Sequence, residues 1–320
     1  MSGPLISLII PVYNVQDYLE ECLDSVLIQD YGNFEVVAVN DGSTDNSREI
    51  LENYERRDSR IRVIDQRNKG LAGARNTGVA AACGDYIAFV DSDDYVTPEY
   101  LSAMAANAIT HDADVSICGR AIDSNGSCVH HVRSGFSGRP LEPSEAFRAL
   151  NSYSSFDMSM CGKLFKADLF EGIEFPEGKN SEDQFVCYRL LLKAGCTYYE
   201  DKPFYVYRHR EGSISRGSRV NVFPIEASHE QLGYVEALYP DLIYAAETSC
   251  FFSQVAVYNA YAVRDRDIPG NISEVILSKP KSYLGSVLGN SDIPKVKKIQ
   301  ALAYCFARPV YRRIYLSKRG

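Results

Sequence analysis

The first ninety or so residues alternate between short apolar runs and segments whose apolar residues recur at helical spacing. This alternation constrains the fold more than any other feature of the chain. The apolar runs cover residues 5–10, 34–39, 61–64 and 86–90. Such runs, bounded by turn residues, are typical of strands that are buried on both faces. Strands that alternate with helices are joined by right-handed crossovers, which make neighbouring strands parallel. The sequence therefore predicts an α/β protein with a Rossmann-like, mostly parallel sheet flanked by helices.

Local signals predict where these elements begin and end. Pro11 follows the first run, and a proline cannot sit inside a central strand, so we expect the strand to end there. Apolar residues at 3.6-residue spacing predict a helix over residues 15–27. Residues 68–78 are rich in glycine and are predicted as a loop that leads into a helix. Thr97 is the expected N-cap of a further helix, with Pro98 in its first position.

The fourth apolar run ends in three carboxylates, Asp91, Asp93 and Asp94. Like charges at this spacing repel one another unless a cation or a polar ligand compensates them. The carboxyl ends of parallel strands are also where open α/β sheets bind ligands. The alternative is a solvated acidic turn before the next helix. A dinucleotide site is disfavoured, because the turn at residues 11–14 reads Pro-Val-Tyr-Asn where a glycine fingerprint is required.

Overall composition excludes some partners and favours one compartment. The formal net charge of −8 and the pI near 5.3 disfavour a general nucleic-acid binder. Nine cysteines without a CxxC pair favour reduced thiols in a cytosolic protein. The chain shows no signal peptide and no run of about 20 apolar residues, so we expect a soluble or peripheral protein.

The C-terminal third carries no chemical motif and is predicted to be mainly helical over residues 219–320. Residues 295–320 contain eight Lys or Arg and no Asp or Glu. Apolar residues recur there at helical spacing at Val296, Ile299, Ala303, Phe306 and Val310, and we expect Pro309 to bend or interrupt the helix. Such a segment can lie on an anionic membrane. The alternative is a helix that packs on the protein or forms a dimer contact.

Five short motifs follow one another along the chain: Pro-Val-Tyr-Asn at 11–14, Val-Asn-Asp-Gly-Ser at 39–43, Ala-Arg-Asn at 74–76, Asp-Ser-Asp at 91–93 and Glu-Asp at 182–183. In this order they resemble the inverting family 2 glycosyltransferases of GT-A fold. Cys-Gly-Lys-Leu-Phe at 161–165 and Tyr-Val-Tyr-Arg at 205–208 extend the resemblance to the bacterial branch that builds capsules and exopolysaccharides. The resemblance covers residues 5–215. It implies a catalytic domain over 1–218, with a nucleotide-binding half at 1–95 and an acceptor-binding half at 96–218.

The resemblance implies a UDP-sugar donor and a divalent metal, Mn²⁺ or Mg²⁺. Asp41 would accept the ring N–H of uracil, although an Asx turn before a helix is the alternative. Asp91 would contact the ribose, and Asp93 would ligate the metal that bridges the diphosphate. His209 is a further candidate ligand.

Other residues at these motifs are predicted to contact the donor. Arg75 can hydrogen-bond the base or a phosphate, with a surface ion pair as the alternative. Gly70 and Gly73 would let the backbone approach the nucleotide closely. The loop 208–219 can close over the donor. The predicted donor-binding set is Pro11, Tyr13, Asn14, Asp41, Asn68, Gly70, Arg75, Asp91, Ser92, Asp93, Lys163 and Arg210.

Asp183 is the candidate general base. Ser181 and Gln184 form a predicted capping box, which places Glu182 and Asp183 in the first turn of a helix. An inverting transfer is a single displacement, so a base must take the proton of the acceptor hydroxyl. A carboxylate near a helix N-terminus stays ionised at neutral pH, as that role requires. The alternative for Asp183 is a purely electrostatic role at the helix start, and Glu182 is expected to orient its neighbours.

These features together predict transfer of one sugar to a hydroxyl of a saccharide acceptor. The resemblance implies that the acceptor is a lipid-linked, polyprenyl-diphosphate type or cell-surface polysaccharide precursor, handled in the cytoplasm or at the inner face of the membrane. The chain contains no Trp, so the QxxRW motif of the processive membrane synthases is absent. A nucleotidyltransferase of related fold and a catalytically silent sugar-binding module are the alternatives. A homo-oligomer is left open.

Overall fold

The computed structural model describes residues 3–124, 126–210 and 219–317. By its internal contacts the chain forms two compact units. The first comprises Met1–Ala146 and Met158–Glu211, and the second comprises Phe147–Asp157 and Gly212–Gly320. The predicted domain boundary after residue 218 falls at a segment, 211–218, that lies outside the described residues.

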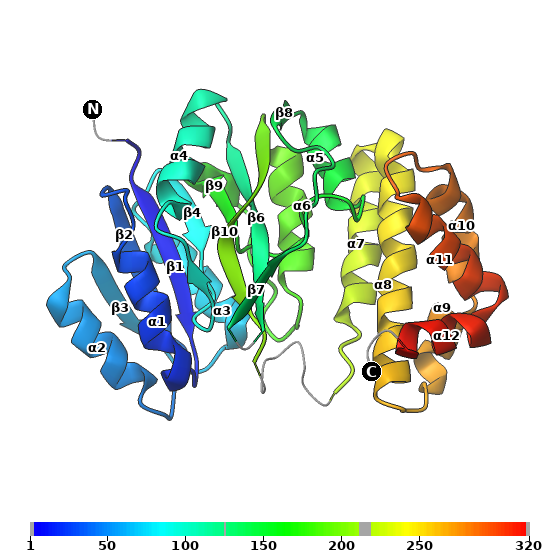
Figure 1. The fold of residues 1–320 in the computed structure, drawn as a ribbon, viewed down its shortest axis with the longest axis horizontal. Helices are drawn as coiled ribbons and strands as arrows, with labels where there is room; N and C mark the ends of the chain where they lie inside the picture. The colour runs from blue at the N-terminus through cyan, green and yellow to red at the C-terminus, as the bar shows by residue number, and fades with distance from the viewer. Residues whose placement is uncertain (1–2, 125, 211–218, 318–320) are drawn as a thin grey trace. The chain divides into compact units, whose positions relative to one another are not determined.

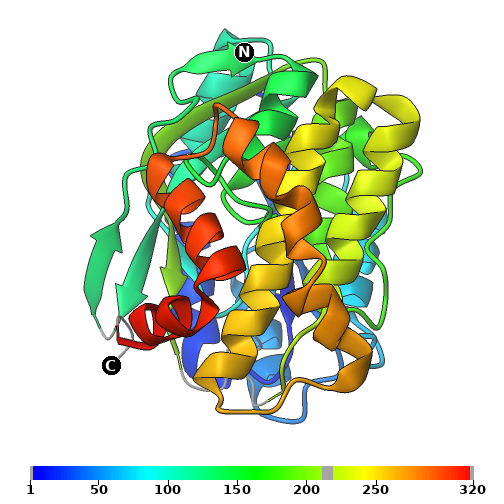
Figure 2. The same cartoon turned by 90° about the vertical axis from the view of Figure 1, so that its right-hand side faces the viewer.

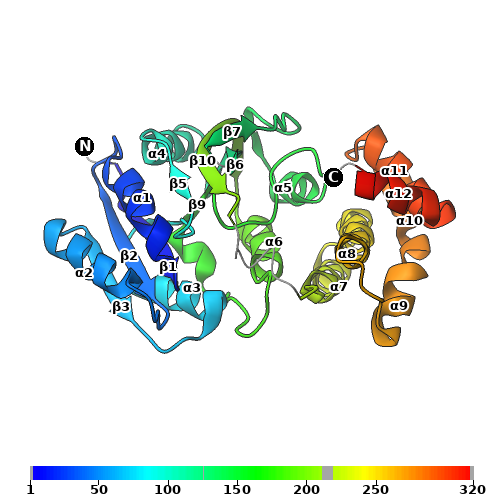
Figure 3. The ribbon, with the colours of Figure 1, turned by 60° about the horizontal axis from the view of Figure 1, so that its bottom comes forward.

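The first half of the first unit is a parallel βαβ array (Figure 1). Its strands are β1 (Ile6–Val12), β2 (Phe34–Asn40), β3 (Ile61–Asp65) and β4 (Tyr86–Phe89), and its helices are α1 (Gln16–Leu27), α2 (Ser47–Arg57) and α3 (Gly70–Ala81). The strands are hydrogen-bonded in the order β3-β2-β1-β4. Right-handed crossovers in this order place α1 and α2 on one face and α3 on the other (Figure 3).

The sheet continues from β4 through β9, β6 and β10 to β5. The further elements of this unit are β5 (Tyr95–Val96), α4 (Tyr100–Thr110), β6 (Val115–Ser124), β7 (Ser127–His130), β8 (Arg139–Leu141), β9 (Lys163–Lys166), η1 (Ala167–Phe170), α6 (Asp183–Lys193) and β10 (Thr197–Arg208), while α5 (Pro143–Leu150) has residues in both units. Strand β9 is antiparallel to β4 and β6, whereas β6 and β10 are parallel. The predicted α/β class is confirmed, with a sheet that is parallel in its first half and mixed in its second.

Strand β1 is longer than predicted, because Pro11 lies inside it and not after it. The amide of Asp41 donates to the carbonyl of Val12, on the β2 side of the strand. The amide of Val90 donates to the carbonyl of Ile9, on the β4 side. Residues alternate between the two sides, so the nitrogen of Pro11 points toward β4 at a level where β4 has already ended. The missing N–H therefore costs the sheet no hydrogen bond, and the prediction that the strand stops at Pro11 is wrong.

The glycine-rich segment is also different from the prediction, because residues 70–78 belong to helix α3 and not to a loop. Gly70 opens the helix with a φ of +76°. Gly78 faces β1, and a Cβ atom placed on it would overlap Cγ2 of Ile9. The glycines therefore serve close packing of a helix on the sheet, which outweighs their low intrinsic helix propensity.

Two predicted helix starts are shifted. Helix α4 begins at Tyr100, and the carbonyl of Thr97 accepts the amide of Tyr100, so Thr97 and Pro98 form a turn ahead of the helix. Helix α6 begins at Asp183 with Glu182 as its N-cap residue, while Ser181 has a φ of +62°. Ser181 is therefore not the N-cap. Asp183 still lies in the first turn, as predicted.

The second unit is helical, as expected for the C-terminal region. It contains α7 (Phe223–Leu238), η3 (Pro240–Leu242), α8 (Ile243–Val263), α9 (Gly270–Leu277), α10 (Pro280–Gly289), α11 (Lys295–Phe306) and α12 (Arg308–Ser317). Pro280 occupies the start of α10, and the helical tail is interrupted at Ala307, just before Pro309. Within the described ranges, none of the helices is long and apolar enough to cross a membrane.

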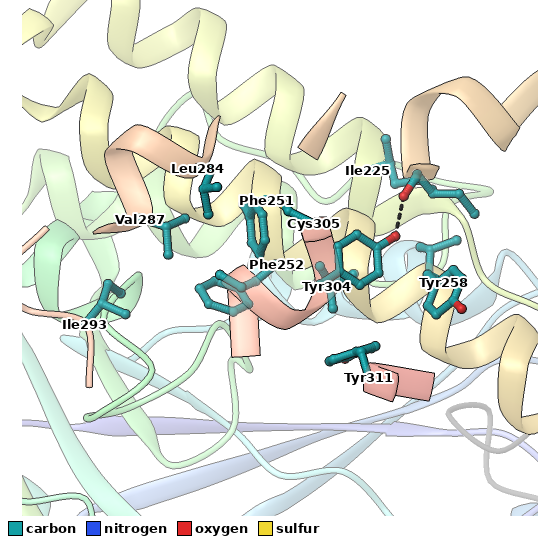
Figure 4. Close-up of a cluster of buried hydrophobic side chains, with 14 of the residues drawn as sticks. Ile225, Phe251, Phe252, Tyr258, Leu284, Val287, Ile293, Tyr304, Cys305 and Tyr311 are labelled. Carbon is teal, nitrogen blue, oxygen red and sulfur yellow. Dashed lines mark hydrogen bonds between the residues drawn. The ribbon is translucent and has the colours of Figure 1, made fainter. Parts of the chain in front are cut away.

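An aromatic core holds the helices of the second unit together (Figure 4). The hydroxyl of Tyr304 donates to the carbonyl of Ile276. The rings of Tyr258 and Tyr311 lie 5.2 and 5.3 Å from the ring of Tyr304, both edge-on. Helices α8, α11 and α12 are therefore joined through one buried cluster. Figure 2 shows the ribbons of these helices from the side of the second unit.

Candidate active site

The carboxyl ends of β1, β2 and β4 lie at one edge of the sheet, because the three strands are parallel. Tyr13 and Asn14 follow β1, Asp41 follows β2, and the Asp91–Asp94 stretch follows β4. The structure therefore brings the predicted donor-binding residues of the first half together at the edge where open sheets bind ligands.

Asp41 is almost fully buried at this edge. Its Oδ1 accepts hydrogen bonds from Nε2 of Gln66 at 2.6 Å and from the amide of Lys69 at 2.8 Å. A carboxylate fixed at one oxygen by two donors can accept another hydrogen bond at the second oxygen. Gln66 had no role in the sequence analysis, and no local pattern indicates that it supports Asp41.

Asn14 and Asn68 shape the loops beside Asp41. Asn14 has a φ of +49°, and its Oδ1 accepts the amide of Thr44 at 2.8 Å, which joins the segments after β1 and β2. Oδ1 of Asn68 accepts the amide of Gly70 at 3.1 Å, next to the start of α3. The side chain of Tyr13 is exposed. Direct contact of these residues with a nucleotide stays a prediction.

Arg75 joins the carboxylates that follow β4 to those that begin α6. It is buried, and its guanidinium contacts Oδ1 of Asp91 at 3.0 Å and Oε1 of Glu182 at 2.6 Å. Oδ2 of Asp183 lies 3.7 Å from the same guanidinium. The ion pair is internal, so the alternative of a surface ion pair is wrong. Contact of Arg75 with a base or phosphate stays a prediction.

Burial by itself would lower the pKa of Arg75. The negative charges of Asp91, Asp183 and Glu182 outweigh this effect and raise the pKa above its ordinary value. Removing one partner of such a buried group typically costs about 3–5 kcal/mol, because a charge is left uncompensated. Arg75 therefore holds its carboxylate partners in place. It fixes two acidic motifs that are far apart in the sequence.

Glu182 is more deeply buried than Asp183. Burial raises the pKa of Glu182 to about 7, against the opposing effect of Arg75 and with a smaller contribution from Asp183. The side chain of Asp183 is 18% exposed, and its Oδ2 accepts the amide of Met160 at 3.3 Å. Asp183 thus combines solvent access with a fixed position, whereas Glu182 lacks access.

Asp93 and Asp94 have different surroundings. Oδ2 of Asp93 accepts Nε of Arg210 at 2.6 Å, and the Asp93 side chain is 21% exposed. Asp94 is buried and accepts the hydroxyl of Tyr205 at 2.6 Å and the amide of Arg208 at 2.8 Å. Burial, followed by the charges of Asp91 and Asp93, raises the pKa of Asp94. Asp94 therefore anchors β10 to this turn, and Asp93 faces outward.

Tyr205 is a residue whose role the sequence did not reveal. Its buried hydroxyl also accepts the amide of Asp91 at 3.2 Å, so one side chain supports both ends of the acidic turn. Ser92, between the aspartates, is buried as well. From the sequence alone, a tyrosine in an apolar strand is expected to be a core residue. The partner of its hydroxyl can be identified only from the structure, where β10 lies beside the acidic turn.

Lys163 was predicted to contact the donor and His209 to bind the metal. In the structure both side chains have hydrogen-bond partners within the protein. Lys163 is buried, and its ammonium donates to the carbonyl of Ser159. Nδ1 of His209 lies 3.1 Å from the hydroxyl of Ser124. Their predicted roles at the donor and the metal stay predictions. Of the loop predicted to close over the donor, residues 211–218 lie outside the described residues.

The acidic turn fits a divalent metal of the kind that substrate phosphates help to hold. In the described part of the chain, no three His, Cys, Asp or Glu side chains form a ready metal cage. Mg²⁺ is commonly bound by one or two carboxylates together with phosphate oxygens, so a full protein cage is not required. Asp93 supplies a partly exposed carboxylate, which pairs with the guanidinium of Arg210 in this structure.

The chain belongs to glycosyl transferase family 2, whose sequence profile matches residues 7–173. It is 38% identical to the glycosyltransferase GlyA of Streptococcus pneumoniae serotype 4 over 221 residues, which cover 66% of this chain and 31% of GlyA. It is 36% identical to the glycosyltransferase GlyG of the same strain, over 66% of this chain and 73% of GlyG. The match therefore spans about a third of GlyA and most of GlyG.

Solved structures with low sequence identity share the fold. The structure of S. aureus TarS 1–349 in complex with UDP-GlcNAc superposes with a TM-score of 0.68 at 23% identity, covering 98% of this chain and 91% of that one. The mannosyltransferase PcManGT from Pyrobaculum calidifontis, in complex with GDP-Man and Mn²⁺, gives a TM-score of 0.56 at 17% identity, with 98% and 85% coverage. The predicted GT-A fold and family are confirmed.

Proposed function

We propose that this glycosyltransferase transfers one sugar from a UDP-sugar to a hydroxyl group of a saccharide acceptor, with inversion at the anomeric carbon. The observation that carries the proposal is the internal ion pair of Arg75, which brings Asp91 and the pair Glu182–Asp183 together at the ligand edge of the sheet. A partly exposed carboxylate beside an acidic turn is the arrangement that a single displacement needs.

Each residue has a separate task in this reaction. Asp41 accepts a hydrogen bond from the base, and Asp91, held by Arg75, accepts one from the ribose. The acceptor hydroxyl attacks the anomeric carbon from the face opposite the nucleotide, and Asp183 takes its proton. The bond between the anomeric carbon and the diphosphate oxygen breaks, and UDP leaves with the electron pair. Glu182 holds Arg75 in place, and Arg75 and the amide of Met160 keep Asp183 in position.

Asp93 would hold Mn²⁺ or Mg²⁺, with phosphate oxygens as the other ligands. When bound, such an ion offsets the negative charge that develops on the leaving diphosphate. Arg210 pairs with Asp93 in the present structure at 2.6 Å. We expect Arg210 to turn to the diphosphate when the donor is bound.

The donor and acceptor classes rest on similarity and on chemistry. TarS was solved with UDP-GlcNAc, which supports a UDP-sugar, whereas PcManGT was solved with GDP-Man. Among the curated relatives is the putative teichuronic acid biosynthesis glycosyltransferase TuaG of Bacillus subtilis, 48% identical over 92 residues. That match covers 28% of this chain and 36% of TuaG, and it supports a cell-surface polysaccharide precursor as the acceptor. The lipid-linked form of the acceptor rests on the family resemblance alone.

The test separates binding from chemistry. With a panel of UDP-sugars, Mn²⁺ and saccharide acceptors, the wild-type protein should release UDP. Asp183→Asn should bind UDP with nearly unchanged affinity by titration calorimetry and turn over roughly 10²–10⁴ times more slowly. Asp93→Asn should lose the Mn²⁺-dependent part of UDP affinity. Asp17→Asn, an exposed carboxylate on α1, serves as the control and should change neither quantity.

Three results would redirect the proposal. Near-normal turnover of Asp183→Asn would remove this residue as base, and Glu182 would be tested next. Formation of UTP and sugar 1-phosphate from a UDP-sugar and added inorganic diphosphate, without release of UDP, would indicate a nucleotidyltransferase. Tight UDP binding without turnover of any donor would indicate a silent binding module.

A further inference from the structure

Helix α11 is apolar on two opposite faces. Ala301, Tyr304 and Cys305 are buried and belong to the core of the second unit (Figure 4). Their neighbours along the chain point the other way. Val296, Ile299 and Phe306 are 67%, 66% and 71% exposed, although all three are apolar. The helix therefore packs on the protein through one face and leaves a second apolar face uncovered by the described residues.

The exposed apolar side chains form one row. Val296, Ile299, Leu302 and Phe306 are spaced three or four residues apart, which places them on one side of α11. Val310 and Ile314, four residues apart, continue exposed apolar surface on α12, which contacts α11. We call these six side chains the tail row. Scattered exposed apolar residues are ordinary, but a contiguous row marks an interaction surface.

Basic side chains accompany the row. Lys295, Arg312 and Arg313 are exposed, and the ammonium of Lys281, on α10, lies 5.7 Å from the ring centre of Phe306. No Asp or Glu occurs in residues 295–320 of the sequence. One acidic partner reaches α12, since Arg312 contacts Oδ1 of the exposed Asp265 at 3.2 Å. The surface is thus apolar and positively charged in a chain whose net charge is −8.

We propose that the tail row docks on the surface of an anionic lipid bilayer. The apolar side chains would enter the boundary between headgroups and acyl chains, and the basic side chains would contact lipid phosphates. An amphipathic helix with basic residues beside its apolar face binds membranes in this way. The proposal goes beyond the glycosyl transfer and does not depend on the identity of the donor.

A bilayer explains the pattern better than a protein partner does. A protein partner would need an apolar groove and carboxylates at matched positions, whereas an anionic bilayer offers an apolar phase and spread negative charge along the whole row. A second copy of this chain is the main alternative occupant, because its net negative charge would also attract the tail. The test below assigns a distinct outcome to that case.

The experiment uses point substitutions in the full chain. Truncation of α11 would remove Tyr304 from the core and unfold the second unit, so it cannot serve. Wild-type protein should sediment with vesicles of phosphatidylglycerol and phosphatidylcholine at low salt, and not with phosphatidylcholine alone. Ile299→Ser/Phe306→Ser should weaken binding at least tenfold, and Lys295→Gln/Arg313→Gln on the order of tenfold. Both pairs should keep the wild-type melting temperature, because these side chains are exposed.

Matched controls lie elsewhere on the surface. The double variant Ile109→Ser/Leu238→Ser removes two apolar side chains that are 60% and 58% exposed. The double variant Arg56→Gln/Arg57→Gln removes two exposed charges on α2. Both controls should bind vesicles like the wild type. Absence of wild-type binding to anionic vesicles at low salt would overturn the proposal, as would equal weakening by the controls. A dimer in sedimentation velocity that Ile299→Ser/Phe306→Ser dissociates, without vesicle binding, would identify a second copy as the occupant.

Discussion

The carboxyl group of Glu182 is buried and contacts the guanidinium of Arg75. Burial raises its pKa, and the positive charge of Arg75 lowers it. Burial, the larger effect, raises its pKa to about 7. A carboxyl group with a raised pKa in the folded state adds stability at low pH, where it is protonated in both states. That contribution is lost as the pH rises from the unfolded pKa, near 4.5, through the folded pKa.

Glu182→Gln should therefore flatten the pH dependence of stability. The amide keeps an oxygen that can accept from Arg75 but has no proton to lose. Between pH 5 and 8, the free energy of unfolding of the wild type should fall relative to that of the variant by on the order of 1–3 kcal/mol. Urea unfolding at several pH values measures this difference. If the wild type and the variant show parallel pH profiles, Arg75 holds Glu182 ionised throughout. Glu174→Gln, at an exposed position, provides the control.

The same residues show what a sequence can reveal about a site. The motifs at 91–93 and 182–183 identified the acidic side chains and placed them near helix and strand ends. The sequence did not show that Arg75 joins them, because residues 75 and 182 meet only after β4, β9 and α6 have packed. Tyr205 and Gln66 are similar cases, since each acts through a partner that is distant in the chain. Local chemistry was predictable, whereas long-range partners were not.

Helix α3 shows how one element depends on close packing. It crosses β1 at Gly78, where a Cβ atom would overlap the side chain of Ile9. Gly78→Ala should lower the free energy of unfolding by about 1–3 kcal/mol, because an extra methyl group is forced into a packed contact. Gly233→Ala, in α7, has no atom within 4 Å of the added Cβ and should raise stability by roughly 0.5–1 kcal/mol. Thermal or urea unfolding measures both, and a neutral or stabilising Gly78→Ala would contradict the packing argument.

Neighbouring strands also explain why the sequence-based prediction was wrong at Pro11 and at the glycines of α3. Apolar periodicity located the four strands and helices α1 and α2 of the first half, because burial sets that pattern directly. Pro11 and the glycines of α3 were misread, since both are ordinary breakers whose effect depends on what lies beside them. Pro11 faces a strand that has ended, and Gly78 faces a strand that lies too close for a side chain. Neither neighbour can be read from the local sequence.

Across the whole molecule, the nine cysteines are free, in keeping with the reduced thiols expected from the sequence. They are distributed over both units, and six of them are buried. Burial raises the pKa of Cys118 and of Cys250 to about 12, so these thiols are almost entirely protonated near pH 8. Only thiolates react with disulfide reagents at useful rates. Thiol reactivity therefore reports whether the packing of both units is intact in solution.

Titration with an aromatic disulfide reagent at pH 8 should thus show two fast thiols, Cys83 and Cys128, which are the exposed ones. Cys196, which is half-buried, should follow more slowly, and the other six should react only as the protein unfolds. In denaturant without reductant, all nine should react, since none is paired. Cys83→Ser/Cys128→Ser should remove the fast phase and leave the slow ones unchanged. Fewer than nine reactive thiols in denaturant would reveal a disulfide, and fast reaction of more than three in buffer would show that part of the core is open.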